Sequence, residues 1–182
     1  MTSAPLDGPR LETARLVMRP PLLEDLDAWA AFQADEESTR WIGGVQSRPV
    51  AWRGLLGVAG SWSLLGFGMF SVLERDTGRW VGRVGPLHPE GWPGDEVGWG
   101  IVRDAWGRGY ATEAAAAAIE WAFDTLGWTD VIHCIDDGNT ASERVAERLG
   151  SRRLRRAVLP PPHPVELTVW GQTRDEWRAR PR

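Results

Sequence analysis

Lysine is missing from this sequence of 182 residues, and all 21 of its basic residues are arginine. This absence excludes a P-loop, whose lysine reaches the bound phosphates, and it excludes chemistry through a lysine Schiff base. Cysteine and tyrosine occur once each, as Cys134 and Tyr110. A single cysteine cannot form a disulfide within the chain, so we expect a reducing, cytoplasmic location. The Cys and His spacing of zinc sites is also absent, and we expect no bound metal.

Long apolar runs are missing as well. No window approaches the roughly 20 apolar residues of a membrane span, and the first residues lack the basic and apolar segments of a signal peptide. The formal net charge of −4 argues against electrostatic binding of nucleic acid. Hydrophobic residues make up 42% of the chain, so we expect one domain over residues 11–178, preceded by a flexible lead at 1–10.

Hydrophobic spacing and turn residues indicate an α/β chain. A hairpin-rich first half precedes an alternation of strands and helices, which favours one mixed sheet with helices on both faces. Strands are predicted at 15–19, 68–74, 79–85, 96–102, 130–135, 151–159 and 165–170. Helices are predicted at 22–34, 49–65, 112–126 and 140–149, with a last helical turn at 173–177. Asn139 or Thr140 is expected to cap the fourth helix, with Glu143 as the capping-box partner of Thr140.

The segment 95–127 organises the rest of the chain. It predicts a strand, a glycine turn at 106–111, and an alanine-rich helix that begins at Thr112 and ends at Gly127. A small-residue turn that opens a helix leaves several backbone N–H groups unpaired at the positive end of the helix dipole. The segment therefore predicts an anion site, best suited to a phosphate or pyrophosphate.

Four blocks of the sequence, in matching order and spacing, resemble the GCN5-related N-acetyltransferases (GNAT), and within them the RimJ/RimL-like alanine acetyltransferases of ribosomal proteins. The blocks are the opening strand at 11–19, the runs 96–114 and 139–150, and the strand before 173–177. Two positions depart from the family. Trp106 stands where the phosphate loop usually has glutamine or arginine. The tyrosine that many relatives use to protonate the leaving thiolate has no counterpart, because Tyr110 lies elsewhere.

The resemblance implies a GNAT fold, whose mostly antiparallel mixed sheet splays open at the cofactor site. It also implies acetyl-CoA as donor and a primary amine as acceptor. Backbone amides of the loop 107–112 would hold the pyrophosphate, and the strand 101–103 would pair with the pantetheine arm. The implied cofactor-binding residues are Ile101, Val102, Arg103, Gly107, Arg108, Gly109, Tyr110, Ala111, Thr112, Asn139, Ser142 and Arg148.

Glu96 is the candidate general base, and a solvated carboxylate at a strand end is the alternative interpretation. Asp95 and His88 are weaker candidates for the same role. Ser142 is the candidate donor to the developing thiolate in place of the missing tyrosine, and an ordinary helix serine is the alternative. The implied reaction is direct attack of the amine in a ternary complex, which depends on alignment rather than on a covalent intermediate.

The acceptor pocket is expected between residues 35–44, the loop around Trp92 and the last two strands. Trp41 and Trp92 would contact the acceptor, and the acidic residues 35–37 would suit a cationic one. A protein N-terminus and a small amine both stay open as acceptors, as do succinyl-CoA as donor and a homodimer. A non-catalytic CoA-binding regulatory module is the rival function. We expect no membrane or nucleic-acid partner.

Three further features are predicted to be structural. Cys134 and His133 lie within an expected strand, where a small thiol and a satisfied imidazole suit a core. The arginine run 152–156 is predicted to form a solvated strand edge.

Overall fold

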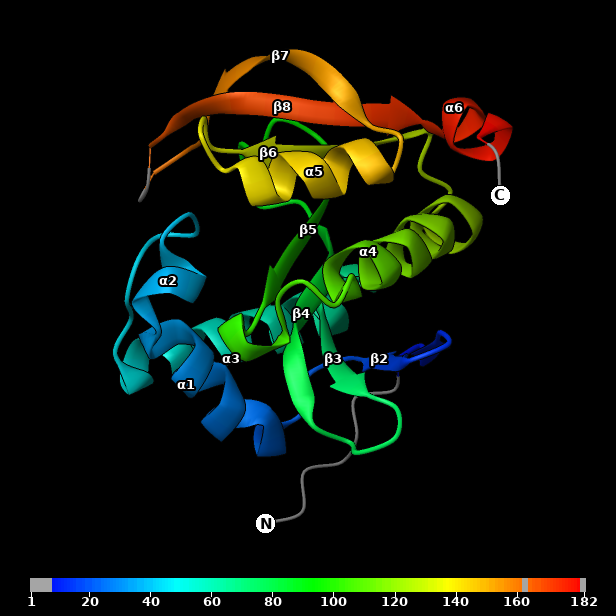
Figure 1. Ribbon diagram of the computed structural model, residues 1–182. Helices are drawn as coiled ribbons and strands as arrows, with labels where there is room; N and C mark the ends of the chain where they lie inside the picture. Colours follow the sequence, from blue (N-terminus) through cyan, green and yellow to red (C-terminus); the bar gives the residue numbers. More distant parts are fainter. Residues whose placement is uncertain (1–7, 162–163, 181–182) are drawn as a thin grey trace.

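Figure 1 shows the computed structural model, which describes residues 8–161 and 164–180. An eight-stranded sheet runs through it in the order β1-β2-β3-β4-β5-β6-β8-β7. The strands are β1 (Leu11–Glu12), β2 (Leu16–Arg19), β3 (Phe70–Glu74), β4 (Trp80–Leu87), β5 (Glu96–Ile101), β6 (Asp130–Ile135), β7 (Arg152–Val158) and β8 (Glu166–Thr173). Residues 1–7 of the expected lead lie outside the described residues.

The sheet opens between β5 and β6. These two strands are parallel, whereas all other neighbours are antiparallel. They pair at one position, Glu96 with Ile132, and then diverge, as Figure 1 shows. The mixed, mostly antiparallel sheet is thus confirmed, and the divergence leaves one edge of β5 without a neighbouring strand.

Helices flank the sheet. They are α1 (Leu26–Ala34), α2 (Glu36–Thr39), α3 (Arg48–Leu65), α4 (Tyr110–Trp121), α5 (Thr140–Arg148) and α6 (Arg174–Ala179). In Figure 1, α4 and α5 lie in front of the sheet and α3 lies behind β4. No helix within the described ranges is long and apolar enough to cross a membrane.

Helix α4 is placed by small side chains. Ala114, Ala115 and Ala118 are fully buried and belong to the main core together with strand residues from β2 to β5. Alanine favours the helix and lets its axis approach the sheet closely. The helix continues as a π-helical turn, Ala122–Leu126, and ends at Gly127, whose φ of 72° confirms the expected C-cap.

Three predicted strand ends need correction, and the largest change is in the last strand, which was expected to end at 170 and continues to Thr173. The strand expected to reach residue 102 ends at Ile101, because the chain then turns through a 3₁₀ segment, Arg103–Ala105. The strand expected to end at 85 continues to Leu87. Proline has no N–H to donate, but Val97, which lies opposite Pro86, does not need one. The Val97 carbonyl instead accepts a hydrogen bond from the His133 side chain, so Pro86 is tolerated in the strand.

Two predictions about helix starts also change. The acidic segment after α1 is itself the start of α2, because the Asp35 carboxylate accepts a hydrogen bond from the Ser38 backbone. Asn139 rather than Thr140 caps α5, and its side chain accepts from the backbone N–H of Ser142. The predicted capping box fails because Glu143 instead accepts from Arg153.

Candidate active site

The glycine turn directly precedes α4, as predicted, but the helix begins at Tyr110 rather than at Thr112. Gly107 and Gly109 have φ angles of 75° and 80°, in the left-handed region that glycine reaches without strain. Gly109 is the N-cap of α4, so the first N–H groups of the helix have no partner within it. Arg15 fixes the outside of the turn by donating to the Arg108 carbonyl at 2.8 Å and by pairing with Glu113.

A cavity of about 660 Å³ lies over this turn. Its wall includes every residue from Trp106 to Thr112, and α5 forms the opposite side with Arg144 and Arg148. These two exposed arginines are four residues apart and therefore share one helix face. Arg148 was expected here from the sequence. Arg144 was missed, although the same spacing along the helix would have indicated it.

Two predicted cofactor ligands have other partners. Arg108 donates to the Glu74 carboxylate at 2.8 Å, so its charge is largely compensated. The Tyr110 side chain is buried, and its hydroxyl donates to the same carboxylate at 3.2 Å. At these two positions the backbone N–H groups thus remain available to an anion, whereas both side chains are engaged by Glu74.

The open edge of β5 lies beside this cavity. Alternation along an antiparallel pair turns the backbone groups of Val97, Trp99 and Ile101 away from β4. The carbonyls of Val97 and Ile101 accept from His133 and from the Trp106 indole, at 2.7 Å each. Trp99 and Ile101 also line the cavity. The backbone groups of Trp99 and Ile101 that face away from β4 are therefore placed to form hydrogen bonds with the amides of a pantetheine arm.

Two residues of the expected arm-binding segment 101–103, Val102 and Arg103, do not line this cavity. Val102 donates its N–H to Val81, and its carbonyl accepts from Ala105 within the 3₁₀ turn. The side chain of Arg103 is exposed and pairs with Asp35 at 3.1 Å. Of the three residues, Ile101 alone lies in β5 and lines the cavity.

Glu96 is buried at the other end of β5, with 6% of its surface exposed, so it is not a solvated carboxylate. The Trp92 indole N–H donates to Oε2 at 2.5 Å, and the Cys134 backbone N–H donates to Oε1 at 3.1 Å. Burial raises the pKa of Glu96, and these two hydrogen bonds oppose the rise. A fixed carboxylate of raised pKa suits a general base.

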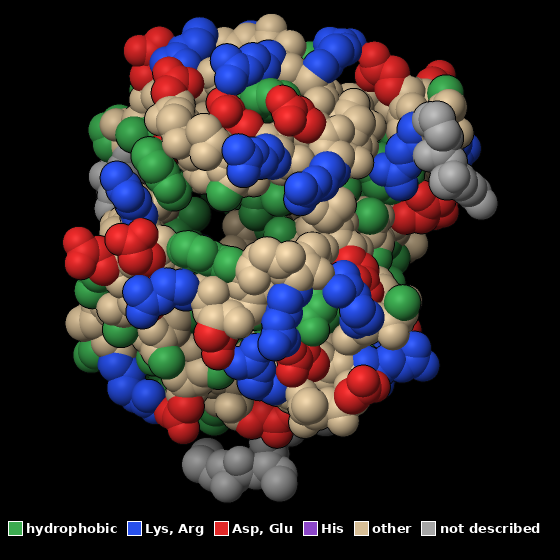
Figure 2. All heavy atoms as spheres, in the orientation of Figure 1, with side chains coloured by type: hydrophobic (Ala, Val, Ile, Leu, Met, Phe, Trp, Pro, Cys, Tyr) green, Lys and Arg blue, Asp and Glu red, His purple; other side chains and the backbone are tan. Residues whose placement is uncertain are grey.

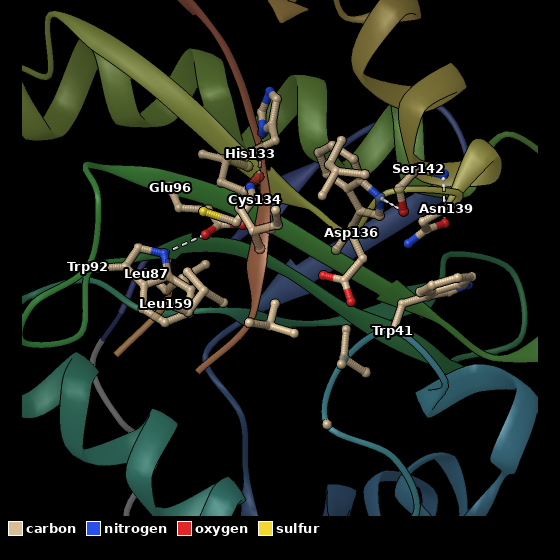
Figure 3. Close-up of a pocket in the computed structure, with 18 of the residues that line it drawn as sticks. Trp41, Leu87, Trp92, Glu96, His133, Cys134, Asp136, Asn139, Ser142 and Leu159 are labelled. Carbon is tan, nitrogen blue, oxygen red and sulfur yellow. Dashed lines mark hydrogen bonds between the residues drawn. The ribbon is translucent and has the colours of Figure 1, made fainter. Parts of the chain in front are cut away.

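A second cavity, of about 610 Å³, surrounds Glu96 (Figure 3). Its wall contains residues 40–44, Trp92 and parts of β8 and of the segment before it, which matches the walls expected of the acceptor pocket. Trp41 and Trp92 both line it, from opposite sides in Figure 3. The acidic residues 35–37 do not line it, because α2 directs them elsewhere.

The two cavities meet at α5. Six residues line both of them: Arg40, Trp41, Ile42, Trp99, Asn139 and Ser142. At this junction the Trp99 indole N–H donates to Ser142 Oγ at 3.2 Å, which leaves the Ser142 hydroxyl proton free to donate. Figure 3 shows Ser142 and Asn139 on one side of the cavity and Glu96 on the other. In Figure 2 a hollow opens on this face, with blue arginine side chains on its rim.

Asp95 and His88 lie outside this arrangement. They pair with each other at 2.6 Å, and neither lines a cavity described above. Of the three candidate bases, Glu96 is therefore the one that the structure brings into the site.

His133 and Cys134 have the structural roles expected of them. His133 is buried and bonded to the Val97 carbonyl and to Ser151 Oγ, and burial lowers its pKa to about 4. Cys134 is partly buried, and burial with the nearby Glu96 charge raises the pKa of its thiol. A thiol kept protonated is a poor nucleophile.

The arginine run on the edge strand β7 is exposed, as predicted, and it is neutralised by neighbours within the chain. Arg152 and Arg153 pair with Glu176 and Glu143, and Arg156 pairs with Asp137. Arg155 donates to the carbonyl of Pro93.

Sequence reasoning missed three residues of the acceptor cavity and its junction. Trp99 positions Ser142, while Arg83 and Asp136 line the acceptor cavity. Burial and the neighbouring Asp137 raise the pKa of Asp136, whose carboxylate Figure 3 shows beside Trp41. These residues come from three different strands or their ends, so no local pattern brings them together.

Comparison with known proteins shows which family the chain belongs to. The acetyltransferase (GNAT) domain matches residues 15–152, which is more than half of the chain. The chain belongs to the GNAT acetyltransferase family. Enzymes of this family generally bind acetyl-CoA and transfer its acyl group to an amine.

The chain is similar to individual proteins, two of which are named acetyltransferases. An acetyltransferase from Agrobacterium tumefaciens is 30% identical, with a TM-score of 0.80 over 96% of this chain and 99% of that one. The N-acetyltransferase p20 of Bacillus licheniformis is 27% identical over 146 residues, covering 79% of this chain and 82% of p20. YkkB of Bacillus subtilis is 36% identical over 87 residues, which span 51% of YkkB.

The ribosomal-protein group is represented among the structural neighbours. The alanine acetyltransferase of ribosomal protein S5 from Vibrio fischeri is 17% identical, with a TM-score of 0.74 over 94% of this chain and 99% of that one. At this identity the likeness establishes the shared GNAT fold alone.

The cavity over the glycine turn fits a CoA molecule. Unpaired N–H groups at the start of α4 suit its diphosphate, and two arginines of α5 add positive charge. The open edge of β5 suits the amides of its arm. The hydrogen-bond donors and positive charges that line this cavity are therefore consistent with binding of acetyl-CoA, the cofactor of the family.

Proposed function

We propose that this protein transfers an acetyl group from acetyl-CoA to a primary amine by direct attack. The observation that supports this most is the junction of the two cavities, with Ser142 and Trp99 on the donor side and Glu96 on the acceptor side. One cavity has the character of an anion and pantetheine site, and the other combines apolar side chains with Arg83, Asp136 and the buried carboxylate of Glu96. Both substrates would meet at Ser142.

Separate groups of residues bind the donor, remove the proton from the amine and stabilise the leaving sulfur. Amides of residues 107–112 and the arginines of α5 bind the donor, and the edge of β5 aligns its arm. Glu96 accepts a proton from the amine, directly or through water, so that the nitrogen lone pair is free to attack the acetyl carbonyl. As the new C–N bond forms and the C–S bond breaks, the Ser142 hydroxyl donates a hydrogen bond to the sulfur.

The amine must be neutral to attack. An α-amino group of pKa near 8 is about one-tenth neutral at pH 7, whereas a lysine side chain near 10.4 is neutral in less than about one molecule in a thousand. α-Amino groups of peptides therefore demand less of the base than lysine side chains do. The proposal includes both a protein N-terminus and a small molecule as the source of the amine.

A thiol-release assay tests the transfer. The protein is incubated with acetyl-CoA and a panel of amines and N-terminal peptides, and free CoA is measured with a thiol reagent. Cys134 contributes little background, because it is partly buried and the pKa of its thiol is raised. Amine-dependent CoA release is expected, and mass spectrometry should show one acetyl group on the amine.

Two other results of this assay would favour the alternative functions. Tight binding of acetyl-CoA without transfer to any amine would favour a non-catalytic CoA-binding module. Faster release from succinyl-CoA than from acetyl-CoA would keep the mechanism and change the donor.

A further inference from the structure

Arg83 lies in the acceptor cavity without an acidic partner. It lies on β4 opposite Gly100 and lines the cavity. Its Nε is buried and makes no hydrogen bond to any residue that the structure describes. Its Nη1 faces the Met69 sulfur at 3.6 Å, and the guanidinium lies over the rings of Trp29 and Phe32 at 5.3 and 6.0 Å.

This placement contrasts with a buried arginine that has a structural role. Arg19 is held by the buried carboxylate of Asp25 at 2.8 Å. For Arg83, no ion pair is found within residues 8–161 and 164–180. Burial lowers its pKa to about 10, so it still carries a full charge at neutral pH. Arg83 is partly exposed and lines the cavity, so its charge is only partly removed from water, and contact with two aromatic rings offsets some of that cost.

The floor of the cavity runs from Arg83 to Glu96. On β4, residues 83, 85 and 87 project from one face, and their partners on β5 are Gly100, Gly98 and Glu96. Of these glycines, Gly98 lines the cavity, and a Cβ there would come within 3.1 Å of Leu87, whereas Phe32 and Phe70 cover Gly100 and Gly85. Because Arg83 and Glu96 both line the cavity, a substrate inside it meets a guanidinium and a carboxylate.

We propose that Arg83 binds a carboxylate of the acceptor, so that the acceptor is a small amino acid or a similar amine that carries an anionic group. This inference rests on the proposed transfer to an amine and narrows its substrate class. The guanidinium suits a carboxylate because its N–H groups form paired, charge-assisted hydrogen bonds. Glu96 and Asp136 suit the ammonium group of the same molecule, and the apolar side chains of Leu87, Leu159 and Leu167 suit its hydrocarbon part.

Other acceptors fit the cavity less well. A diamine would place a second cation near Arg83, where it would be repelled. A protein N-terminus has an amide in place of the α-carboxylate, so it would leave the guanidinium unpaired. Both are outcomes that the following experiment can detect.

Matched pairs of amines test whether a carboxylate on the acceptor promotes its acetylation. Each pair differs in the carboxylate alone: phenylalanine and phenethylamine, methionine and 3-(methylthio)propylamine, 4-aminobutyrate and propylamine. We expect kcat/KM to be at least about 10-fold higher for the carboxylate-bearing member of the preferred pair. Equal rates, or a preference for the plain amine, would overturn the inference.

Arg83→Met separates a binding role from a structural one. Methionine keeps an apolar stem against Trp29 and Phe32 but removes the charge. In this variant KM for the carboxylate-bearing member should rise about 10- to 100-fold, while the plain amine is unaffected. The melting temperature of the free protein should rise, because a partly buried charge without an acidic partner is lost. Arg53→Met, at an exposed position of α3, is the control.

The remaining outcomes are also decisive. An equal effect of Arg83→Met on both members of a pair, or a lower melting temperature, would assign Arg83 a structural role. If acetyl-CoA binds but no amine is acetylated, the proposed transfer fails for these amines, and 3-phenylpropionate then tests the anion site alone. A thermal shift by this carboxylate that Arg83→Met abolishes would support the site, and no shift in the unaltered protein would overturn it.

Discussion

At the scale of single residues, the buried carboxylate of Glu96 governs how the activity depends on pH. Burial raises its pKa, so Glu96 becomes protonated at a higher pH than an ordinary glutamate, near 4.3. It acts as a base only when deprotonated. Below the pKa of the amine, log kcat/KM should rise with a slope of one per pH unit. Below the pKa of Glu96 that slope should steepen to two.

Glu96→Gln should remove the steeper limb and lower kcat/KM by about 10²- to 10⁴-fold, because glutamine accepts no proton. The measurement is the pH profile of amine acetylation for both proteins. Glu90→Gln, at an exposed position of the loop before β5, serves as control and should leave the profile unchanged. An identical profile in Glu96→Gln would assign proton removal to water alone.

Ser142 carries a second prediction at this scale. Its hydroxyl accepts from Trp99 and keeps its own proton for the leaving sulfur. Ser142→Ala should lower kcat by about 10- to 100-fold, less than the loss of a donor from a full oxyanion hole, and change KM for acetyl-CoA little. The matched variant is Ser61→Ala, because Ser61 is an exposed helix serine that donates within α3. A loss confined to KM would indicate that Ser142 binds CoA without assisting the departure of sulfur.

Sequence patterns located these two residues but not their surroundings. Glu96 and Ser142 follow from the resemblance, since each lies in a matched block. The burial of Glu96 depends on Trp92 and on the β6 backbone, and sequence spacing gives no measure of either. Arg83 was missed for a related reason: its role appears only once the β4–β5 register places it opposite Gly100.

At the scale of elements, the glycine turn and α4 are local features, and the sequence predicted both. Alanine content and two glycines indicate the helix and place its start to within two residues, although Arg15 also contacts the turn. The extent of β5 was predicted less well, because its end depends on hydrogen bonds with Val81 and within the following 3₁₀ turn. The short helix α2 was missed because its start resembled a break in the preceding helical pattern.

Gly109→Ala tests the turn as an anion site. A Cβ in the left-handed conformation costs about 1–2 kcal/mol, and the turn would have to change shape to avoid it. Weaker binding of acetyl-CoA is expected, by about 10-fold or more, measured by calorimetry. Gly78→Ala introduces the same strain at φ 69° in the β3–β4 hairpin, where nothing lies within 4 Å of the new Cβ. Equal affinity losses in both variants would mean that the effect comes from general destabilisation.

At the scale of the whole molecule, a chain of side-chain hydrogen bonds joins the two parts of the sheet where the backbone ladder is missing. Gln172 on β8 donates to Ser151, which bonds His133 on β6, and His133 bonds the Val97 carbonyl on β5. His133 can donate to a carbonyl and accept from Ser151 only as the neutral imidazole. The complete chain of hydrogen bonds therefore requires an uncharged histidine, because the nitrogen that accepts from Ser151 must carry no proton.

This network predicts how stability depends on pH. The pKa of His133 is about 4 in the folded protein and about 6.5 when unfolded, so the unfolded state binds more protons between these values. The stabilisation is present above pH 6.5 and is lost as pH falls, by about 2 kcal/mol at pH 5. Urea unfolding of the protein and of His133→Gln at pH 7 and pH 5 measures it. The variant should be less stable at pH 7 and should lose less on acidification, and parallel losses would contradict the assignment.

In the proposed mechanism the two substrates meet between the glycine turn and Glu96, and a crystal structure with bound CoA would show whether they do. We expect the diphosphate on the backbone N–H groups of residues 107–112, the arm along the free edge of β5, and the sulfur beside Ser142, facing the cavity that contains Glu96. A diphosphate bound elsewhere, or a sulfur directed away from that cavity, would contradict it.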